Sequence, residues 1–259
     1  MELELATIGA SVAGAIASKD ILTKALGPTA EYFGGELKNL VARCNINLDD
    51  VFRGSVRKGA GDMPGSVDAR TAKAVIDDAA YCEDALIKDY YSGLLCGAKS
   101  ESGDDEALSY VSVLKTMSKI QVKTHFLIYA VMHGQVKGQI TSITDERDRS
   151  KLRIYMNLER FFGFVGQPSA DPEATINHIV SGLQRAGLIG QHFAYGDPSY
   201  VNVAYPDLKI EVPSLVVCPS ILGVELFLWA AGIRNPNPNL ILQSDEIMSR
   251  FPKEYIDAL

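Results

Sequence analysis

Residues 171–230 read DPEATINHIVSGLQRAGLIGQHFAYGDPSYVNVAYPDLKIEVPSLVVCPSILGVELFLWA, and this stretch decides the fold of the C-terminal part of the chain. Asp171 is placed to cap a helix, Pro172 takes its first position, and Gly187 ends it. The apolar residues in between repeat at helical spacing: Ile176, Ile179, Val180, Leu183 and Leu188. We therefore predict one helix over residues 171–188.

The residues after this helix predict a hairpin, an extended strand and a further helix. Apolar and polar residues alternate on both sides of Gly196-Asp197-Pro198, which we interpret as the turn of the hairpin. Cys218-Pro219-Ser220 then opens a new helix, and residues 217–226 resemble the Leu-Thr-Pro-x-Gly-x-x-Leu stretch that follows the wing in many winged-helix regulators, with Cys218 where Thr is usual. This order predicts a winged-helix-like domain over residues 151–259.

Residues 1–150 predict a helical domain that ends near Ser150, where a charge run indicates a linker. The Gly-rich stretch 51–66 is interpreted as a loop with a short extended piece. Helical periodicity marks five segments: residues 6–21, 29–45, 68–80, 83–96 and 104–134. The predicted fold class is mainly α with a small β-hairpin: an N-terminal helical bundle followed by the winged-helix-like module.

The predicted helix 171–188 carries the candidate binding residues Asn177, His178, Gln184 and Arg185. A helix that reads DNA presents Lys, Arg, Asn or Gln to the major groove and has basic residues nearby. Here the predicted wing tip contains Asp197, the chain has a formal net charge of −7, and residues 151–259 hold more acidic than basic residues. The acidic charge disfavours DNA and favours a protein partner.

The N-terminal stretch, residues 6–21, is rich in Ala, Gly and Ser, and Gly9, Ala13 and Gly14 form a ridge of small residues. Such ridges allow close helix approach, so three alternatives stay open: a packed core helix, self-assembly into a homo-oligomer, and membrane contact through residues 5–21. The charge-free apolar run is about 14 residues long, short of the roughly 20 that span a bilayer. Acidic residues follow Met1 where a secretory signal is cationic, so a cytoplasmic location is expected.

We expect no catalytic constellation, metal site or cofactor. The four cysteines lack CxxC spacing and the four histidines lack zinc-ligand spacing. Residues 93–100, GLLCGAKS, differ from a P-loop by Ala98 and close a predicted helix instead of opening one. Gly9 to Ala13 resembles a nucleophile elbow, but residues 1–8 are too few to supply the preceding sheet strand.

Four stretches resemble the Abi-alpha family of prokaryotic phage-defence proteins, which is named for abortive infection. The matching stretches are residues 26–34 (LGPTAEYFG), 64–67 (PGSV), 92–105 (Ser92-Gly93-Leu94-Leu95 through SESGDD) and 222–230 (LGVELFLWA). The resemblance implies a role in antiphage defence and transfers no active-site residues.

Three hypotheses follow from these observations. The first is a non-enzymatic defence protein that binds a phage or host component through the winged-helix-like module. The second is a winged-helix transcription regulator that binds DNA, and the third is a membrane-acting effector that uses the N-terminal helix.

Overall fold

The computed structural model describes residues 28–60, 64–136, 142–167, 171–243 and 246–259, with the side chains of 28–37 and 60 left out. The predicted helix 6–21, with Gly9, Ala13 and Gly14, lies outside these residues. The chain divides into two compact units, residues 1–46 and 47–259. The predicted boundary near Ser150 lies inside the second unit. The main hydrophobic core of this unit contains buried residues from both sides of that boundary, from Val51 to Phe251.

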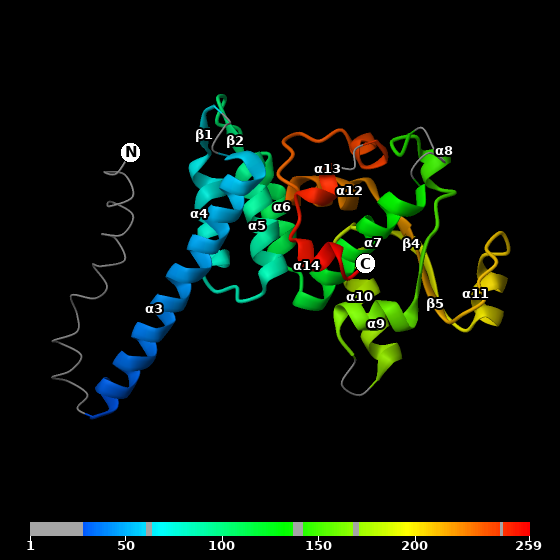
Figure 1. Ribbon diagram of the computed structural model, residues 1–259, viewed down its shortest axis with the longest axis horizontal. Helices are drawn as coiled ribbons and strands as arrows, with labels where there is room; N and C mark the ends of the chain where they lie inside the picture. Colours follow the sequence, from blue (N-terminus) through cyan, green and yellow to red (C-terminus); the bar gives the residue numbers. More distant parts are fainter. Residues whose placement is uncertain (1–27, 61–63, 137–141, 168–170, 244–245) are drawn as a thin grey trace. The chain divides into compact units, whose positions relative to one another are not determined.

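The described part of the chain is mainly helical, with two small antiparallel sheets (Figure 1). Its helices are α3 (Pro28–Ser55), η2 (Val56–Ala60), α4 (Ala69–Ala79), α5 (Ala85–Gly97), α6 (Ala107–Lys115), α7 (Lys119–Val136), α8 (Glu146–Arg149), α9 (Leu158–Val165), α10 (Pro172–Arg185), α11 (Pro198–Ala204), α12 (Ile221–Ala230), η3 (Pro238–Leu242), α13 (Glu246–Ser249) and α14 (Lys253–Ile256). Its strands are β1 (Ser66–Val67), β2 (Lys99–Ser100), β3 (Ile154–Asn157), β4 (Ile189–Gly196) and β5 (Ser214–Pro219). The predicted fold class, mainly α with a small β-hairpin, is confirmed.

The larger sheet has the strand order β3-β5-β4, with both pairs antiparallel. Strand β3 precedes α9 and α10 in the chain, and β4 and β5 follow them. The sheet therefore pairs β3, which comes before α9 and α10 in the chain, with the β4-β5 hairpin, which comes after them. A small β-hairpin is present, as predicted, but β4 pairs with β5 and not with the residues directly after Pro198. Strand β3 was not predicted.

The connection between β4 and β5 differs from the predicted turn. Gly196 lies opposite Ser214, and the chain between these strands carries α11, which begins at Pro198. Asp-Pro begins a helix here as it does at Asp171-Pro172, because proline is pre-shaped for the first helical position. Helix α11 packs Val201 against Val216, so β5 is buried on both faces.

Two other predicted boundaries are wrong. Residues 51–55, predicted as loop, belong to α3, and the chain after them is kinked at Gly59, whose φ is 108°. The predicted helix 104–134 is two helices, α6 and α7. A capping box separates them: the Ser118 backbone N–H donates to Gln121 Oε1 at 2.8 Å, and the Gln121 N–H lies 3.4 Å from Ser118 Oγ.

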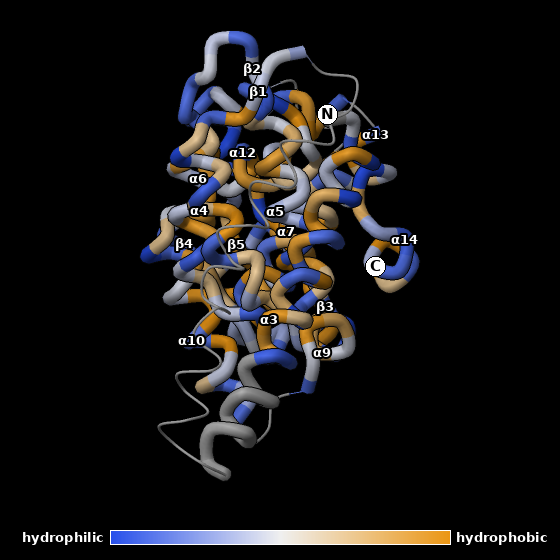
Figure 2. Tube along the Cα trace, turned by 90° about the vertical axis from the view of Figure 1, so that its left-hand side faces the viewer, coloured by the Kyte–Doolittle hydropathy of each residue, from blue (hydrophilic) through white to orange (hydrophobic). Residues whose placement is uncertain are grey.

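The centre of the second unit consists of α5, α7 and α12, whose hydrophobic residues gather in its interior (Figure 2). Helices α5 and α12 cross closely at Gly93, where a Cβ atom would lie 1.9 Å from the carbonyl oxygen of Ala230. Gly97, one turn later, faces the Trp229 ring. Gly93, the glycine that gave residues 93–100 their likeness to a P-loop, therefore allows two helices to pack.

Candidate binding site on helix α10

Helix α10 is fixed by its cap and by its buried face. The Asp171 carboxylate accepts hydrogen bonds from the backbone N–H groups of Glu173, at 2.9 Å, and Ala174, at 3.2 Å. Four apolar side chains on one side of the helix are buried: Ile176, Ile179, Val180 and Leu183. The opposite side of the helix is consequently held toward solvent in a defined orientation.

Three of the four predicted binding residues lie on this solvent-facing side. Asn177, His178 and Arg185 are exposed. Gln184 is half-buried, and its Nε2 atom donates to the carbonyl oxygens of Gly190 at 3.2 Å and Gln191 at 2.9 Å. Its side chain therefore ties the end of α10 to the start of β4.

A shallow pocket of about 530 Å³ lies between α10, β4 and α11. Its lining contains three aromatic residues, one carboxylate and one amide, together with small residues: Phe193, Tyr195, Tyr200, Glu173, Asn177, Ala194 and Gly196. The alternation of Phe193 and Tyr195 in the sequence predicts a strand but does not by itself indicate a binding surface. The pocket thus joins one predicted binding residue, Asn177, to an aromatic group that sequence reasoning missed.

The rings in this pocket are ordered by the strand and by α10. Phe193 and Tyr195 lie on one face of β4 with ring centroids 6.3 Å apart and an interplanar angle of 6°. The Tyr195 hydroxyl donates to Glu173 Oε1 at 3.3 Å. Tyr200, on α11, is 62% exposed. Flat aromatic surface is therefore open to a ligand beside a carboxylate.

The electrostatic character of the pocket is negative. Burial raises the pKa of Tyr195, and the negative charges of Glu173 and Asp171 raise it further. No Lys or Arg is among the described residues that line the pocket. Asp197 lies beside it as the residue before α11, and its carboxylate makes no capping hydrogen bond to that helix. Anionic ligands are therefore disfavoured here.

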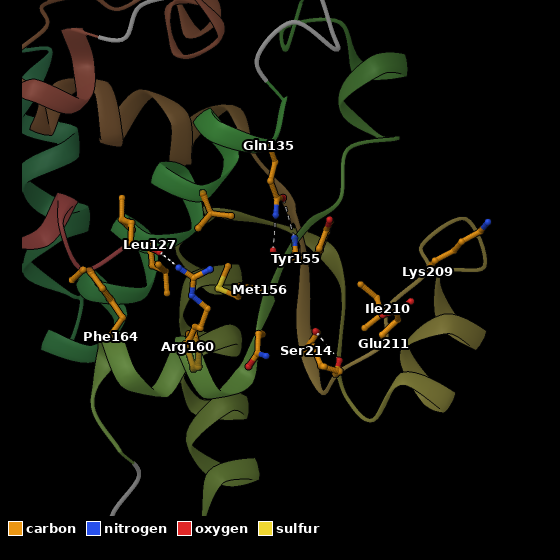
Figure 3. Close-up of a pocket in the computed structure, with 16 residues that line it drawn as sticks. Leu127, Gln135, Tyr155, Met156, Arg160, Phe164, Lys209, Ile210, Glu211 and Ser214 are labelled. Atoms are coloured by element: carbon orange, nitrogen blue, oxygen red, sulfur yellow. Dashed lines mark hydrogen bonds between the residues drawn. The ribbon is translucent and has the colours of Figure 1, made fainter.

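A second pocket, of about 350 Å³, lies beside the free edge of β3 (Figure 3). Gln135 of α7 pairs with this edge: its Nε2 atom donates to the Tyr155 carbonyl oxygen at 2.7 Å, and the Tyr155 N–H lies 3.3 Å from its Oε1 atom. Arg160 donates to the carbonyl oxygen of Leu259 at 2.5 Å. Lys209 points away from the pocket. The polar groups of this pocket do not converge on one point.

His125, a histidine with a strongly shifted pKa, is fully buried in the core. Burial lowers its pKa to about 3. Its Nε2 atom lies 3.1 Å from the Gly223 carbonyl oxygen and its Nδ1 atom 2.8 Å from the Tyr90 hydroxyl. All these groups are enclosed, so the network connects α5, α7 and α12 and is closed to a substrate.

A buried ion pair joins η2 to α5. Lys58 Nζ lies 2.8 Å from Asp89 Oδ2 and donates to the Arg250 carbonyl oxygen at 2.8 Å. Burial lowers the pKa of Lys58 and raises that of Asp89, while the attraction between them opposes both shifts. Arg57 also contacts Asp89, at 2.6 Å. The negative charge of Asp89 is therefore compensated by Lys58 and Arg57.

Among the described residues, no group of three or more His, Cys, Asp or Glu side chains is arranged to hold a metal ion. The helices in the described ranges include none that is both long and apolar enough to cross a membrane.

Comparison of the chain with protein-family models, with curated proteins and with solved structures finds no match in any of the three.

Proposed function

We propose that this chain is a non-enzymatic component of prokaryotic antiphage defence that acts in the cytoplasm by binding a phage or host protein through the exposed side of α10. The observation that carries the proposal is the surface around α10, which is aromatic and acidic. Exposed aromatic rings are typical of protein-contact sites, whereas carboxylates repel the phosphates of nucleic acids.

The element order supports a winged-helix-like module as the scaffold of this surface. Winged-helix proteins have a helix, a strand, two helices and a hairpin in this order, and their first strand pairs with the last. The same order runs here through α7, β3, α9, α10, β4 and β5, and β3 pairs with β5. In this arrangement α10 corresponds to the recognition helix. One fold can bind many kinds of ligand, so the ligand is inferred from the exposed residues on the surface of the module.

The role in defence rests on the four stretches that resemble the Abi-alpha family. Residues 222–230, the last of these stretches, lie entirely in α12 and supply Phe227 and Trp229 to the core. Most side chains of this stretch are buried, so it supports a shared scaffold and leaves the target to be read from the exposed surface.

The second candidate function is DNA binding by the same module, favoured by the element order. Arg185 is the only Lys or Arg on α10, whereas phosphate contacts require several. A mobility-shift assay with random duplex DNA separates the two functions. We expect no shift at physiological salt, and salt-sensitive binding that is lost in Arg185→Gln would favour DNA.

A plaque assay tests the proposal in cells. Bacteria that express the chain are challenged with a phage panel and compared with cells that carry Asn177→Ala, His178→Ala and Arg185→Ala together. We expect the unmodified chain to lower plaque numbers and the triple variant to lose this protection at equal expression and thermal stability. Ser112→Ala, an exposed substitution on α6, is the control and should protect. Protection by the triple variant would contradict the proposal.

A further inference from the structure

We propose that the pocket between α10, β4 and α11 binds an arginine side chain from an exposed basic segment of the protein partner. This inference rests on the proposed function and deepens it, because it names the chemistry by which the partner is recognised. Three features of the pocket support it: the arrangement of the rings, the carboxylates, and the exposure of the aromatic surface.

The rings suit a flat cation. A guanidinium group stacks on aromatic faces and is attracted by their negative quadrupole. Phe193 and Tyr195 present nearly parallel rings from one face of β4, and Tyr200 adds a third ring from α11. A compact, strongly hydrated ammonium group matches such flat surfaces less well, so arginine is preferred over lysine.

The carboxylates supply the matching charge. Glu173 lines the pocket and holds the Tyr195 hydroxyl, and Asp171 and Asp197 lie at the starts of the helices beside it. Glu173 accepts from a tyrosine and can also accept from a guanidinium, because a carboxylate has about four lone-pair sites. Nucleic-acid bases would also stack on the rings, but their phosphates would meet these carboxylates, so the charge favours the cation.

The exposed side chains of α11 extend the surface beyond the pocket. Tyr200 is 62% and Val203 78% exposed, and both belong to the helix that replaces the predicted wing turn. A partner segment that places an arginine against the rings that line the pocket would also cover these side chains. The pocket would then anchor a larger contact.

The test uses the full chain and an N-acetylated Gly-Arg-Gly amide as probe, with the citrulline peptide as the uncharged control. Binding is followed by NMR through the side-chain signals of Phe193, Tyr195 and Tyr200. We expect the arginine peptide to shift these signals and the citrulline peptide to bind at least about tenfold more weakly, because charge-assisted hydrogen bonds are lost. Equal binding of the two peptides, or shifts that map elsewhere, would overturn the inference.

Matched variants connect the binding to the pocket. Glu173→Gln removes one charge and keeps an oxygen for Tyr195, and Glu159→Gln changes the equivalent second position of α9 as a control. Glu173→Gln should weaken the arginine peptide about fivefold, and Tyr200→Leu about two- to fivefold. Glu159→Gln should bind like the unmodified chain. Unchanged affinity in both pocket variants would overturn the inference.

The remaining outcomes separate this inference from the proposed function. If the α10 triple variant loses phage protection but the arginine peptide does not bind, the arginine pocket is wrong and the proposed function stands. If the peptide binds but the triple variant still protects, the proposed function is wrong while the pocket stands. A dimer of the chain that the arginine peptide dissociates would overturn the assignment to a separate partner.

Discussion

His125 Nε2 lies 3.1 Å from the carbonyl oxygen of Gly223, so the core of the second unit contains a histidine with a fixed tautomer. A carbonyl oxygen can only accept, and therefore Nε2 carries the proton and Nδ1 accepts from the Tyr90 hydroxyl at 2.8 Å. The neutral ring satisfies both neighbours. A protonated ring would place a second proton against Tyr90 in a fully buried site.

This arrangement predicts how stability depends on pH. The folded pKa of His125 is about 3, below the ordinary value of 6.5. The unfolded chain therefore takes up a proton as the pH falls below about 6.5, and the folded chain does not, so stability should fall by about 1.4 kcal/mol for each pH unit between those values. Urea unfolding at pH 7, 6 and 5 measures the slope.

Two variants isolate the contribution of His125. His125→Gln removes the titration and should reduce the slope, whereas the exposed His192→Gln should leave it unchanged. NMR of the His125 ring should show the neutral form at pH 5. A ring that titrates near pH 6.5 in the folded chain would refute this assignment.

The crossing of α5 and α12 predicts a severe effect of Gly93→Ala. The added methyl group would lie 1.9 Å from the Ala230 carbonyl oxygen, which belongs to the backbone and cannot turn away. We expect a loss of about 3 kcal/mol in the free energy of unfolding. Gly134→Ala is the matched control, since this helical glycine has no atoms within 4 Å of the added carbon. It should be stabilising by up to about 1 kcal/mol, and equal effects of the two substitutions would contradict the close crossing.

The buried pair of Lys58 and Asp89 predicts a strong coupling. Asp89→Asn leaves the Lys58 charge buried without its counter-ion, which should cost about 3–5 kcal/mol of unfolding free energy. Lys58→Met combined with Asp89→Asn should cost less than the sum of the two single changes, since both members of the buried pair are then neutral. Denaturation of the four members of this double-mutant cycle measures the coupling.

An exposed pair provides the comparison for that cycle. Lys73 and Asp77 form an i,i+4 ion pair on the surface of α4. Their coupling should be about 0.3–0.5 kcal/mol. Similar couplings in the two pairs would show that Lys58 and Asp89 are solvated in the folded chain.

Gln184 and His178 are predicted to act differently although they lie on the same helix. Gln184→Ala removes hydrogen bonds to Gly190 and Gln191, so it should lower stability by about 1 kcal/mol. His178→Ala removes an exposed side chain and should leave the unfolding free energy unchanged within about 0.5 kcal/mol. Thermal unfolding distinguishes them, and a larger loss from His178→Ala would reverse the assigned roles.

The sequence predicted those helices that begin with their own signals. Asp68 and Asp171 both cap helices as expected, each accepting backbone N–H groups. Ser118 and Gln121 have the spacing of a capping box, but the apolar stripe that continues across them predicts one helix where the structure has α6 and α7. Local capping decided the boundary there against hydrophobic periodicity.

The remaining differences depend on contacts between distant residues. The Gly-rich stretch 51–60 predicts a loop, yet residues 51–55 extend α3, with Val51 buried. The kink at Gly59 follows directly after Lys58, which is buried against Asp89. The aromatic pocket likewise forms where α10 and α11 contact β4, and no local sequence pattern predicts these contacts. Sequence reasoning therefore identified the helix that carries the site and missed its neighbours.

Site-specific photocrosslinking in infected cells tests whether α10 contacts a protein partner, with the photoreactive amino acid placed at His178 on α10 or, as the control, at Ser112 on α6. We expect an infection-dependent protein adduct from position 178 that survives nuclease treatment and is missing from position 112. An adduct at position 178 that consists of DNA, or identical protein adducts from both positions, would contradict it.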